Sequence, residues 1–357
     1  MAKEKFLPTL QALAPFEKVG FYEFYNAKQC IFKGCEKNLK LEGGSLNESI
    51  SRSTLIGRFY HQVMEEVGKV ESLEDLHLRV EELILDYQQL LNSNPNLVSS
   101  GSFSGWKEVN TAAKRAYQRY KNKDNVQKAV IAEAEKLLVS KDGCFIGRPD
   151  YFTISGDCCN LVELKSTSIR DNRGEIKEDY NQQLLFYSFL IFDNYPIESV
   201  NAKLQSLLGD SESLTISKDE AHKYFQESIA SLKSMNNLIN KISDLNIENI
   251  TAPGIQQCQY CNKKIICSSF KKSQFNLQLQ GATYVIEGIL KAHNKLSQST
   301  DSLEIFDINL KSQTKVVLNG KSTLPVSIGG KYLIDNLKFE DNIFRGTKLT
   351  EIYSCHD

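Results

Sequence analysis

The sequence predicts an α/β fold: a small mixed sheet flanked by helices, with a helical insertion and a small β-barrel-like domain at the carboxyl end. Three observations predict it. Helical periodicity dominates residues 46–138. Apolar runs separated by turn signals follow over residues 137–167, as expected for strands. Residues 275–357 then carry short β-like runs with turn residues between them.

The helices are predicted from apolar residues at helical spacing. In the first of them, Ile56, Phe59, Tyr60 and Val63 fall on one face. Proline and asparagine-rich breakers separate the segments. The expected helices span residues 46–70, 73–91, 106–138, 178–193 and 217–245.

A strand meander is expected between the third and fourth helices. The Asp-Gly and Gly-Asp pairs at residues 142–143 and 156–157 lie between apolar runs, which is a hairpin signal. The expected strands span residues 137–140, 144–154 and 160–166, and a further strand is expected at 199–207.

The carboxyl-terminal segment suggests a small β-barrel of the OB or SH3 type. We therefore expect one domain over residues 1–270 and a second over 271–357. Asn319-Gly320-Lys321-Ser322 resembles the tail of a phosphate-binding loop, but the position of the first glycine holds Lys315, so a hairpin turn is expected. The expected strands span residues 282–290, 303–310, 314–318, 331–337 and 342–344.

Composition restricts the function only broadly. The chain has 43 basic and 44 acidic residues, so global charge gives no argument for nucleic-acid binding. A local basic segment with interleaved tyrosines spans residues 114–123, although a solvated helix face would look the same. Residues 1–16 do not resemble a signal peptide and no run is long enough to cross a membrane, which favours a cytoplasmic or nuclear protein.

The residues with the clearest chemistry are Asp150, Glu163 and Lys165. Alternation along a strand places Glu163 and Lys165 on one face and turns Leu164 away, and a hairpin can bring Asp150 opposite Glu163. Two carboxylates suit Mg²⁺ or Mn²⁺, and such an ion with a neighbouring lysine suits phosphodiester hydrolysis. A Glu-x-Lys triplet alone is more often ordinary strand surface.

Three further features accompany this triplet. His61 lies four residues after Gly57 on an expected helix and offers an imidazole, although a histidine beside aromatic residues is often only a core residue. Gln183 and Tyr187 lie four apart and share a helix face. Three cysteines within ten residues indicate a metal or cluster site; they are Cys258, Cys261 and Cys267.

The order of these motifs resembles the iron–sulfur branch of the PD-(D/E)XK nucleases, which includes RecB-like and AddB-type exonuclease domains and the CRISPR adaptation nucleases. The resemblance covers roughly residues 30–268 and implies a restriction-endonuclease-like core. The motifs in order are an amino-terminal cysteine, Gly57-x3-His61, Pro149-Asp150, Glu163-x-Lys165, Gln183-x3-Tyr187 and Cys258-x2-Cys261-x5-Cys267.

The resemblance also implies roles at the matching positions. Lys165 would be the catalytic lysine, and Gln183 and Tyr187 would line the site and contact the substrate strand. The cysteines at 258, 261 and 267 would hold a [4Fe–4S] cluster with one amino-terminal cysteine. The metal ligands would be His61, Asp150, Glu163 and the Leu164 carbonyl.

The fourth cysteine ligand is ambiguous. Cys35 follows Phe32 by three residues and keeps the aromatic residue that the family shows, but lacks the following proline; Cys30 lacks both. We prefer Cys35, with Cys30 as the alternative. Zinc is the alternative metal, since four thiolates suit either.

Two hypotheses about function follow. The first is a Mg²⁺- or Mn²⁺-dependent deoxyribonuclease, an exonuclease acting on single strands or DNA ends, in repair or antiviral defence. The barrel-like domain would bind nucleic acid or a protein, and a separate helicase would supply any unwinding. The second is a non-catalytic nucleic-acid-binding or scaffold subunit with a nuclease-like fold and structural zinc. Polarity, exonuclease or endonuclease action, and DNA or RNA as substrate stay open.

Overall fold

The computed structural model describes residues 5–43, 46, 52–67, 69–93, 106–121, 131–242, 246–259, 261–277, 279, 283–319, 326–347 and 350–355. The chain forms two compact units. Residues 17–21 and 49–231 form the first, here called the sheet unit. Residues 1–16, 22–48 and 232–357 form the second, here called the barrel unit. The division of the chain after residue 270 stays a prediction.

The sheet unit is built on a five-stranded mixed sheet in the order β3-β6-β7-β8-β9. All neighbouring pairs are antiparallel except β7 and β8, which are parallel because helix α6 (Glu178–Asn194) connects them. The strands are β3 (Ile131–Ala134), β6 (Tyr151–Ser155), β7 (Cys158–Lys165), β8 (Ser199–Ser206) and β9 (Ser211–Ser217).

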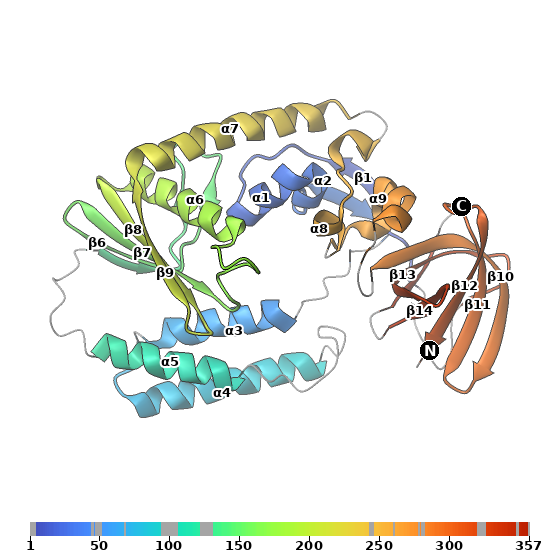
Figure 1. The fold of residues 1–357 in the computed structure, drawn as a ribbon, viewed down its shortest axis with the longest axis horizontal. Coiled ribbons are helices and arrows are strands. Elements are labelled where there is room, and N and C mark those ends of the chain that lie inside the picture. Colours follow the sequence, from blue (N-terminus) through green and yellow to red (C-terminus); the bar gives the residue numbers. More distant parts are fainter. Residues whose placement is uncertain are drawn as a thin grey trace. The chain divides into compact units, whose positions relative to one another are not determined.

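Helices cover both faces of this sheet, which confirms the predicted fold class (Figure 1). Leu164 of β7 belongs to a buried cluster with residues of α3 (Arg52–Val67), α4 (Leu73–Ser93) and α5 (Trp106–Lys121). Helices α6 and α7 (Lys218–Asn240) pack together through the stacked rings of Phe189 and Phe225, 3.6 Å apart. Leu164 therefore points toward α3–α5, away from its two neighbours, as predicted.

The predicted meander is confirmed in outline but wrong in two places. Residues 131–134 were expected in a helix; they form β3, because pairing of Ile131 with Ile154 and of Ala134 with Tyr151 outweighs the helix preference of alanine and glutamate. The single strand expected over 144–154 is two strands, β5 (Ile146–Gly147) and β6, because Pro149 cannot donate a ladder hydrogen bond. Strand β5 pairs with β4 (Leu138–Val139).

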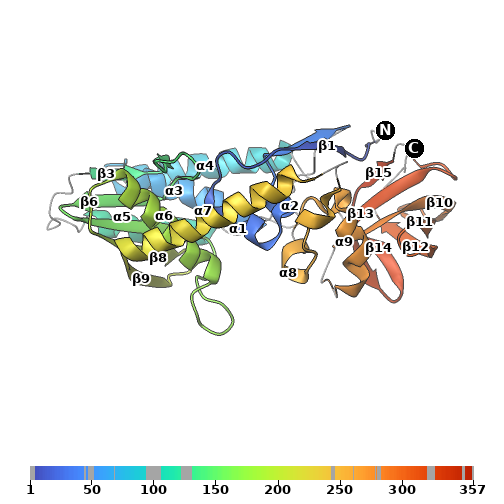
Figure 2. The ribbon, with the colours of Figure 1, turned by 90° about the horizontal axis from the view of Figure 1, so that it is seen from above.

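The carboxyl-terminal strands form a closed barrel, which confirms the β-barrel prediction (Figure 2). Their order is β10-β11-β12-β14-β13, and β13 pairs back to β10. Since β12 and β14 are parallel and all other barrel pairs antiparallel, the topology is that of an OB barrel. The strands are β10 (Tyr284–Ser297), β11 (Thr300–Asp307), β12 (Ser312–Asn319), β13 (Lys331–Glu340) and β14 (Ile343–Gly346). Gly320-Lys321-Ser322 lies outside the described residues.

Shorter elements complete the barrel unit. A buried cluster joins Phe32, Cys258, Cys267 and Phe270 to Val285 of the barrel. None of the helices in the described part of the chain is long and apolar enough to span a membrane. The elements are β1 (Thr9–Leu13), α1 (Phe21–Gln29), α2 (Ile31–Gly34), β2 (Leu39–Glu42), η1 (Ile247–Ile250), α8 (Ile255–Cys258), η2 (Lys264–Ile266), α9 (Ser268–Ser273), η3 (Gln274–Asn276) and β15 (Ile352–Ser354), which pairs with β13.

Candidate active site

Two neighbouring strands bring Asp150, Glu163 and Lys165 together. Because Tyr151 of β6 pairs with Val162 of β7, Asp150 stands beside Glu163, one position further along. The Leu164 amide donates a 2.5 Å hydrogen bond to Asp150 Oδ2. The register of β6 and β7 therefore brings these three residues together, as the sequence predicts.

Lys165 is buried among polar partners. Its Nζ lies 3.0 Å from Glu163 Oε1 and donates to Gln183 Oε1 at 2.5 Å. Gln183 in turn donates to the Tyr187 hydroxyl at 3.3 Å. Only 7% of Lys165 and 2% of Glu163 and Gln183 are exposed. Since a buried ammonium is costly without such partners, the lysine is held in one position.

Tyr180 also contacts this lysine, and sequence reasoning missed it. Lys165 Nζ lies 4.8 Å from the centre of the Tyr180 ring. The Tyr180 hydroxyl forms a 3.1 Å hydrogen bond with Thr167 Oγ1. Tyr180 stands one turn before Gln183 on α6 and so shares its face. That spacing was the available signal.

Gly147 explains how Tyr187 reaches the site. A Cβ at residue 147 would lie 2.7 Å from Tyr187 Cε1 and 2.8 Å from Leu190 Cδ1. Any larger residue would therefore push α6 away from β5. This glycine lets the helix lie close to the strand that leads into Pro149 and Asp150.

His61 of α3 joins the carboxylates. Its Nδ1 lies 3.1 Å from Asp150 Oδ1 and 3.7 Å from Glu135 Oε1. Burial opposes a charge on this ring, but the hydrogen bonds to Asp150 and Glu135 outweigh burial and raise the pKa of His61 to about 10.

Glu135 is a second residue that sequence reasoning missed, because residues 106–138 were expected to be one helix. One ligand atom from each of His61, Glu135 and Asp150 can be chosen so that all three lie within 4.8 Å of one another. The backbone of Glu135 lies in the left-handed region, with φ at 50°. No local sequence pattern marked this position, because it depends on the pairing of β3 with β6.

Glu163 has one oxygen without a protein partner. Glu163 Oε2 is buried and accepts no hydrogen bond within the described part of the chain. Burial raises the pKa of Glu163 above its ordinary value, and the charge of Lys165 opposes this. A buried unsatisfied carboxylate oxygen beside a histidine and further carboxylates fits a divalent cation.

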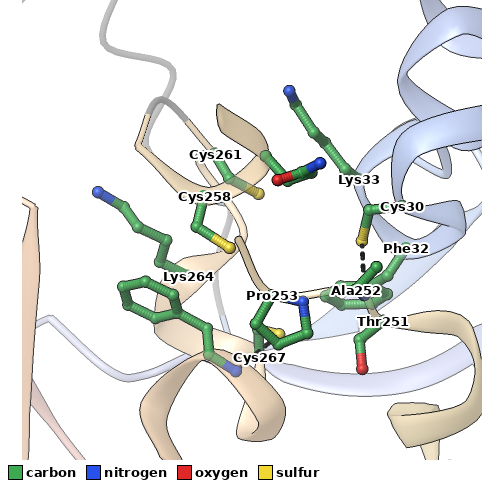
Figure 3. A pocket seen from close by; sticks show the side chains of 12 residues that line it. Cys30, Phe32, Lys33, Thr251, Ala252, Pro253, Cys258, Cys261, Lys264 and Cys267 are labelled. Carbon is green, nitrogen blue, oxygen red and sulfur yellow. Dashed lines mark hydrogen bonds between the residues drawn. The ribbon is translucent and has the colours of Figure 1, made fainter. Parts of the chain in front are cut away.

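Four cysteines of the barrel unit line one cavity (Figure 3). Cys258, Cys261, Cys267 and Cys30 all border it, and Cys30 Sγ accepts a hydrogen bond from the Ala252 amide at 3.5 Å. Cys35, the preferred fourth ligand in the sequence analysis, does not line this cavity and is completely buried. The structure therefore groups the three clustered cysteines with Cys30.

The surroundings of these thiols suit a bound metal group. Phe32, Pro253 and Phe270 supply apolar walls, and burial raises the pKa of Cys267 to about 12. Lys264 also lines the cavity, and burial lowers its pKa while the Cys261 and Cys258 charges oppose this. Metal coordination would stabilise the thiolates that burial alone disfavours.

The basic segment of the sequence analysis is described only in part. Lys114 and Arg115 lie on α5 within the described residues. The side chains from Arg119 to Lys121, and residues 122 and 123 altogether, lie outside them. The predicted substrate-binding role of this segment stays a prediction.

Comparison with known proteins identifies relatives of this chain. The family description of the PD-(D/E)XK nuclease superfamily matches residues 32–268. A presumed exonuclease from Eubacterium rectale is 14% identical, with 64% of this chain and 83% of that chain covered at a TM-score of 0.40. An alkaline exonuclease from Laribacter hongkongensis is 16% identical, with 40% and 84% covered at a TM-score of 0.22. A search of curated proteins finds no match.

Proposed function

The chain belongs to the PD-(D/E)XK nuclease superfamily, whose match spans residues 32–268, and we propose that it is a Mg²⁺- or Mn²⁺-dependent deoxyribonuclease. The observation that supports this most is the convergence of Asp150, Glu163 and Lys165, with a buried carboxylate oxygen of Glu163 that has no hydrogen-bond partner among the residues that the structure describes. A nuclease-like fold that had lost its catalytic activity would not be expected to keep a buried lysine in contact with a buried carboxylate.

The residues divide between holding the cation and handling the substrate. Asp150, Glu163 and His61 would bind the divalent ion, with the Leu164 carbonyl as a further ligand. When bound, such an ion polarises a phosphoryl oxygen and lowers the pKa of water. These residues are placed by β6, β7 and α3, so the site rests on rigid elements.

Lys165 would orient the attacking water and stabilise negative charge on the phosphate. Its contacts with Glu163 and Gln183 fix the ammonium at the site, so little reorganisation is needed during the reaction. Gln183 and Tyr187 would line the site and contact the substrate strand. We propose single strands or DNA ends as the substrate and an exonuclease action, in repair or antiviral defence.

We further propose that Cys30, Cys258, Cys261 and Cys267 hold a [4Fe–4S] cluster. The support is that the four thiols surround a cavity with apolar walls. A single zinc ion holds its thiolates only about 2.3 Å away, so a cavity between them suits the larger group better. The cluster would tie the amino-terminal helices to the segment around residue 260, with a structural role.

The test is cleavage of end-labelled single- and double-stranded DNA by the full chain with Mg²⁺ or Mn²⁺. Asp150→Asn and Lys165→Ala are expected to lower the rate by at least about 100-fold while circular dichroism stays unchanged. Cleavage is expected to stop when EDTA removes the divalent ion. Equal cleavage by the wild-type protein and both variants would overturn the proposal and favour a non-catalytic DNA-binding subunit.

A further inference from the structure

The carboxylate oxygens of the candidate site indicate where a cation would lie. Asp150 Oδ2 already accepts the Leu164 amide, and Glu163 Oε1 already contacts Lys165. Neither of these contacts uses Asp150 Oδ1 or Glu163 Oε2. Asp150 Oδ1 is the oxygen that faces His61, at 3.1 Å from Nδ1. A cation bound by Asp150 is therefore expected on the His61 side.

Glu135 lies on that same side. Its Oε1 is 3.7 Å from His61 Nδ1, and ligand atoms of Glu135, His61 and Asp150 lie within 4.8 Å of one another. Ligands of one hard cation, each about 2.0–2.6 Å from it, lie at most about 5 Å apart. We propose that Glu135 is a direct carboxylate ligand of the divalent cation, together with His61 and Asp150.

The position of Glu135 is built by the main chain. Strand β3 pairs with β6 up to Ala134 opposite Tyr151. One residue further, the Glu135 amide donates to the Asp150 carbonyl at 3.2 Å. Because the backbones of Glu135 and Asp150 are bonded to each other, the two side chains start from adjacent points. Glu135 is thus fixed beside Asp150 and is not a mobile surface residue.

A separate observation also indicates a ligand. Glu163 Oε2 is buried and has no hydrogen-bond partner among the described residues, and the charge of Glu163 acts on both Asp150 and His61. A buried carboxylate oxygen in a native protein is normally satisfied, so this oxygen favours a cation near the carboxylates.

The chain offers a matched control two residues away. Glu133 has an exposed side-chain fraction of 33%, compared with 35% for Glu135. Its carboxylate contacts Lys136 Nζ at 2.5 Å instead of His61. Replacing either glutamate with glutamine removes one negative charge from the same strand end, but only Glu135→Gln would remove a ligand.

The inference rests on the proposed function, and Mn²⁺ binding tests it without relying on cleavage. Mn²⁺ affinity of the full chain would be measured by electron paramagnetic resonance and titration calorimetry. Glu135→Gln is expected to weaken Mn²⁺ binding by about tenfold or more, while Glu133→Gln stays within about twofold. Glu135→Asp keeps a carboxylate and should recover part of the affinity.

The outcomes separate this inference from the proposed function. If Asp150→Asn loses Mn²⁺ binding but Glu135→Gln keeps wild-type affinity, Glu135 is not a ligand and the proposed site stands. If Asp150→Asn also binds Mn²⁺ as the wild-type protein does, the cation site itself is misplaced. If Glu133→Gln and Glu135→Gln weaken Mn²⁺ binding equally, the loss comes from the change in local charge and not from a lost ligand. That result would also overturn the inference.

Discussion

At the scale of single residues, the ring of Tyr180 contacts two lysines. Its centre lies 4.8 Å from Lys165 Nζ and 5.1 Å from Lys177 Nζ. Cation–π contacts stabilise an ammonium by roughly 0.5–2 kcal/mol, depending on its desolvation. Lys165 is buried, so the contact belongs to the stronger end of that range.

We predict that Tyr180→Leu lowers kcat by about 5- to 30-fold, because losing the contact with the ring costs roughly 1–2 kcal/mol in holding Lys165 in position. Tyr180→Phe keeps the ring and loses only the hydroxyl bond to Thr167. It should therefore stay close to wild-type activity. The measurement is kcat and KM on end-labelled DNA. If both variants lose activity equally, the hydroxyl of Tyr180, and not its ring, supports the activity, and the prediction is wrong.

The sequence was sufficient for residues within recognisable motifs and insufficient for those outside them. Asp150, Glu163 and Lys165 come together as their strand spacing predicts, and Gln183 joins them as the family resemblance implies. Glu135 could not be found, because its place depends on pairing with a strand that starts 16 residues later. Cys30 was the second choice for the fourth cysteine ligand, because its sequence neighbours do not match the family pattern. Its position beside the other three cysteines depends on how the chain folds, which the local sequence does not show.

At the scale of elements, Glu287 fastens helix α9 to the barrel. This β10 residue contacts Lys271 of α9 at 2.5 Å and Lys331 of β13 at 3.2 Å, one lysine at each carboxylate oxygen. Burial alone would raise the pKa of Glu287, but the two lysines outweigh burial and lower the pKa below its ordinary value of 4.5. The ionised carboxylate is therefore the form that stabilises the fold.

This pKa shift predicts a pH-dependent loss of stability. Because the folded pKa is depressed, the contribution is present above pH 4.5 and is lost as the pH falls through the folded pKa. Glu287→Gln should lower the free energy of unfolding by about 1–3 kcal/mol at pH 7, and the difference should shrink below pH 4.5. Urea unfolding at both pH values, followed by circular dichroism, measures it. Glu304→Gln on β11 is the control, and an equal loss at both pH values would contradict the assignment.

The two edge strands of the sheet unit, β3 and β9, were missed for one cause. Helix and strand periodicity identified α6, β7 and β8 because each carries its own strong pattern. Strand β9 was missed, since its residues alternate between exposed and half-exposed positions and only pairing with β8 makes them a strand. Strand β3 was missed for the same reason. An edge strand forms through pairing with the neighbouring strand, and a local sequence pattern does not show this pairing.

At the scale of the whole molecule, the cysteine cavity joins distant parts of the chain. The barrel unit contains residues 22–48 and 232–357, and the sheet unit is inserted between them. Cys30 comes from the first segment and Cys258, Cys261 and Cys267 from the second. A group bound to all four closes a chain loop of roughly 230 residues, which by analogy with a disulfide stabilises the fold by about 3–5 kcal/mol.

The proposed cluster and its fourth ligand can be tested together. Purified protein is expected to be brown, with visible absorbance and about four irons per chain for a [4Fe–4S] cluster. Cys30→Ala should lose the iron and lower the thermal midpoint, because one ligand and the long loop closure are lost. Cys35→Ala should keep its iron, since Cys35 lies outside the cavity. A colourless protein with stoichiometric zinc would overturn the cluster, and iron retained in Cys30→Ala but lost in Cys35→Ala would reverse the ligand assignment.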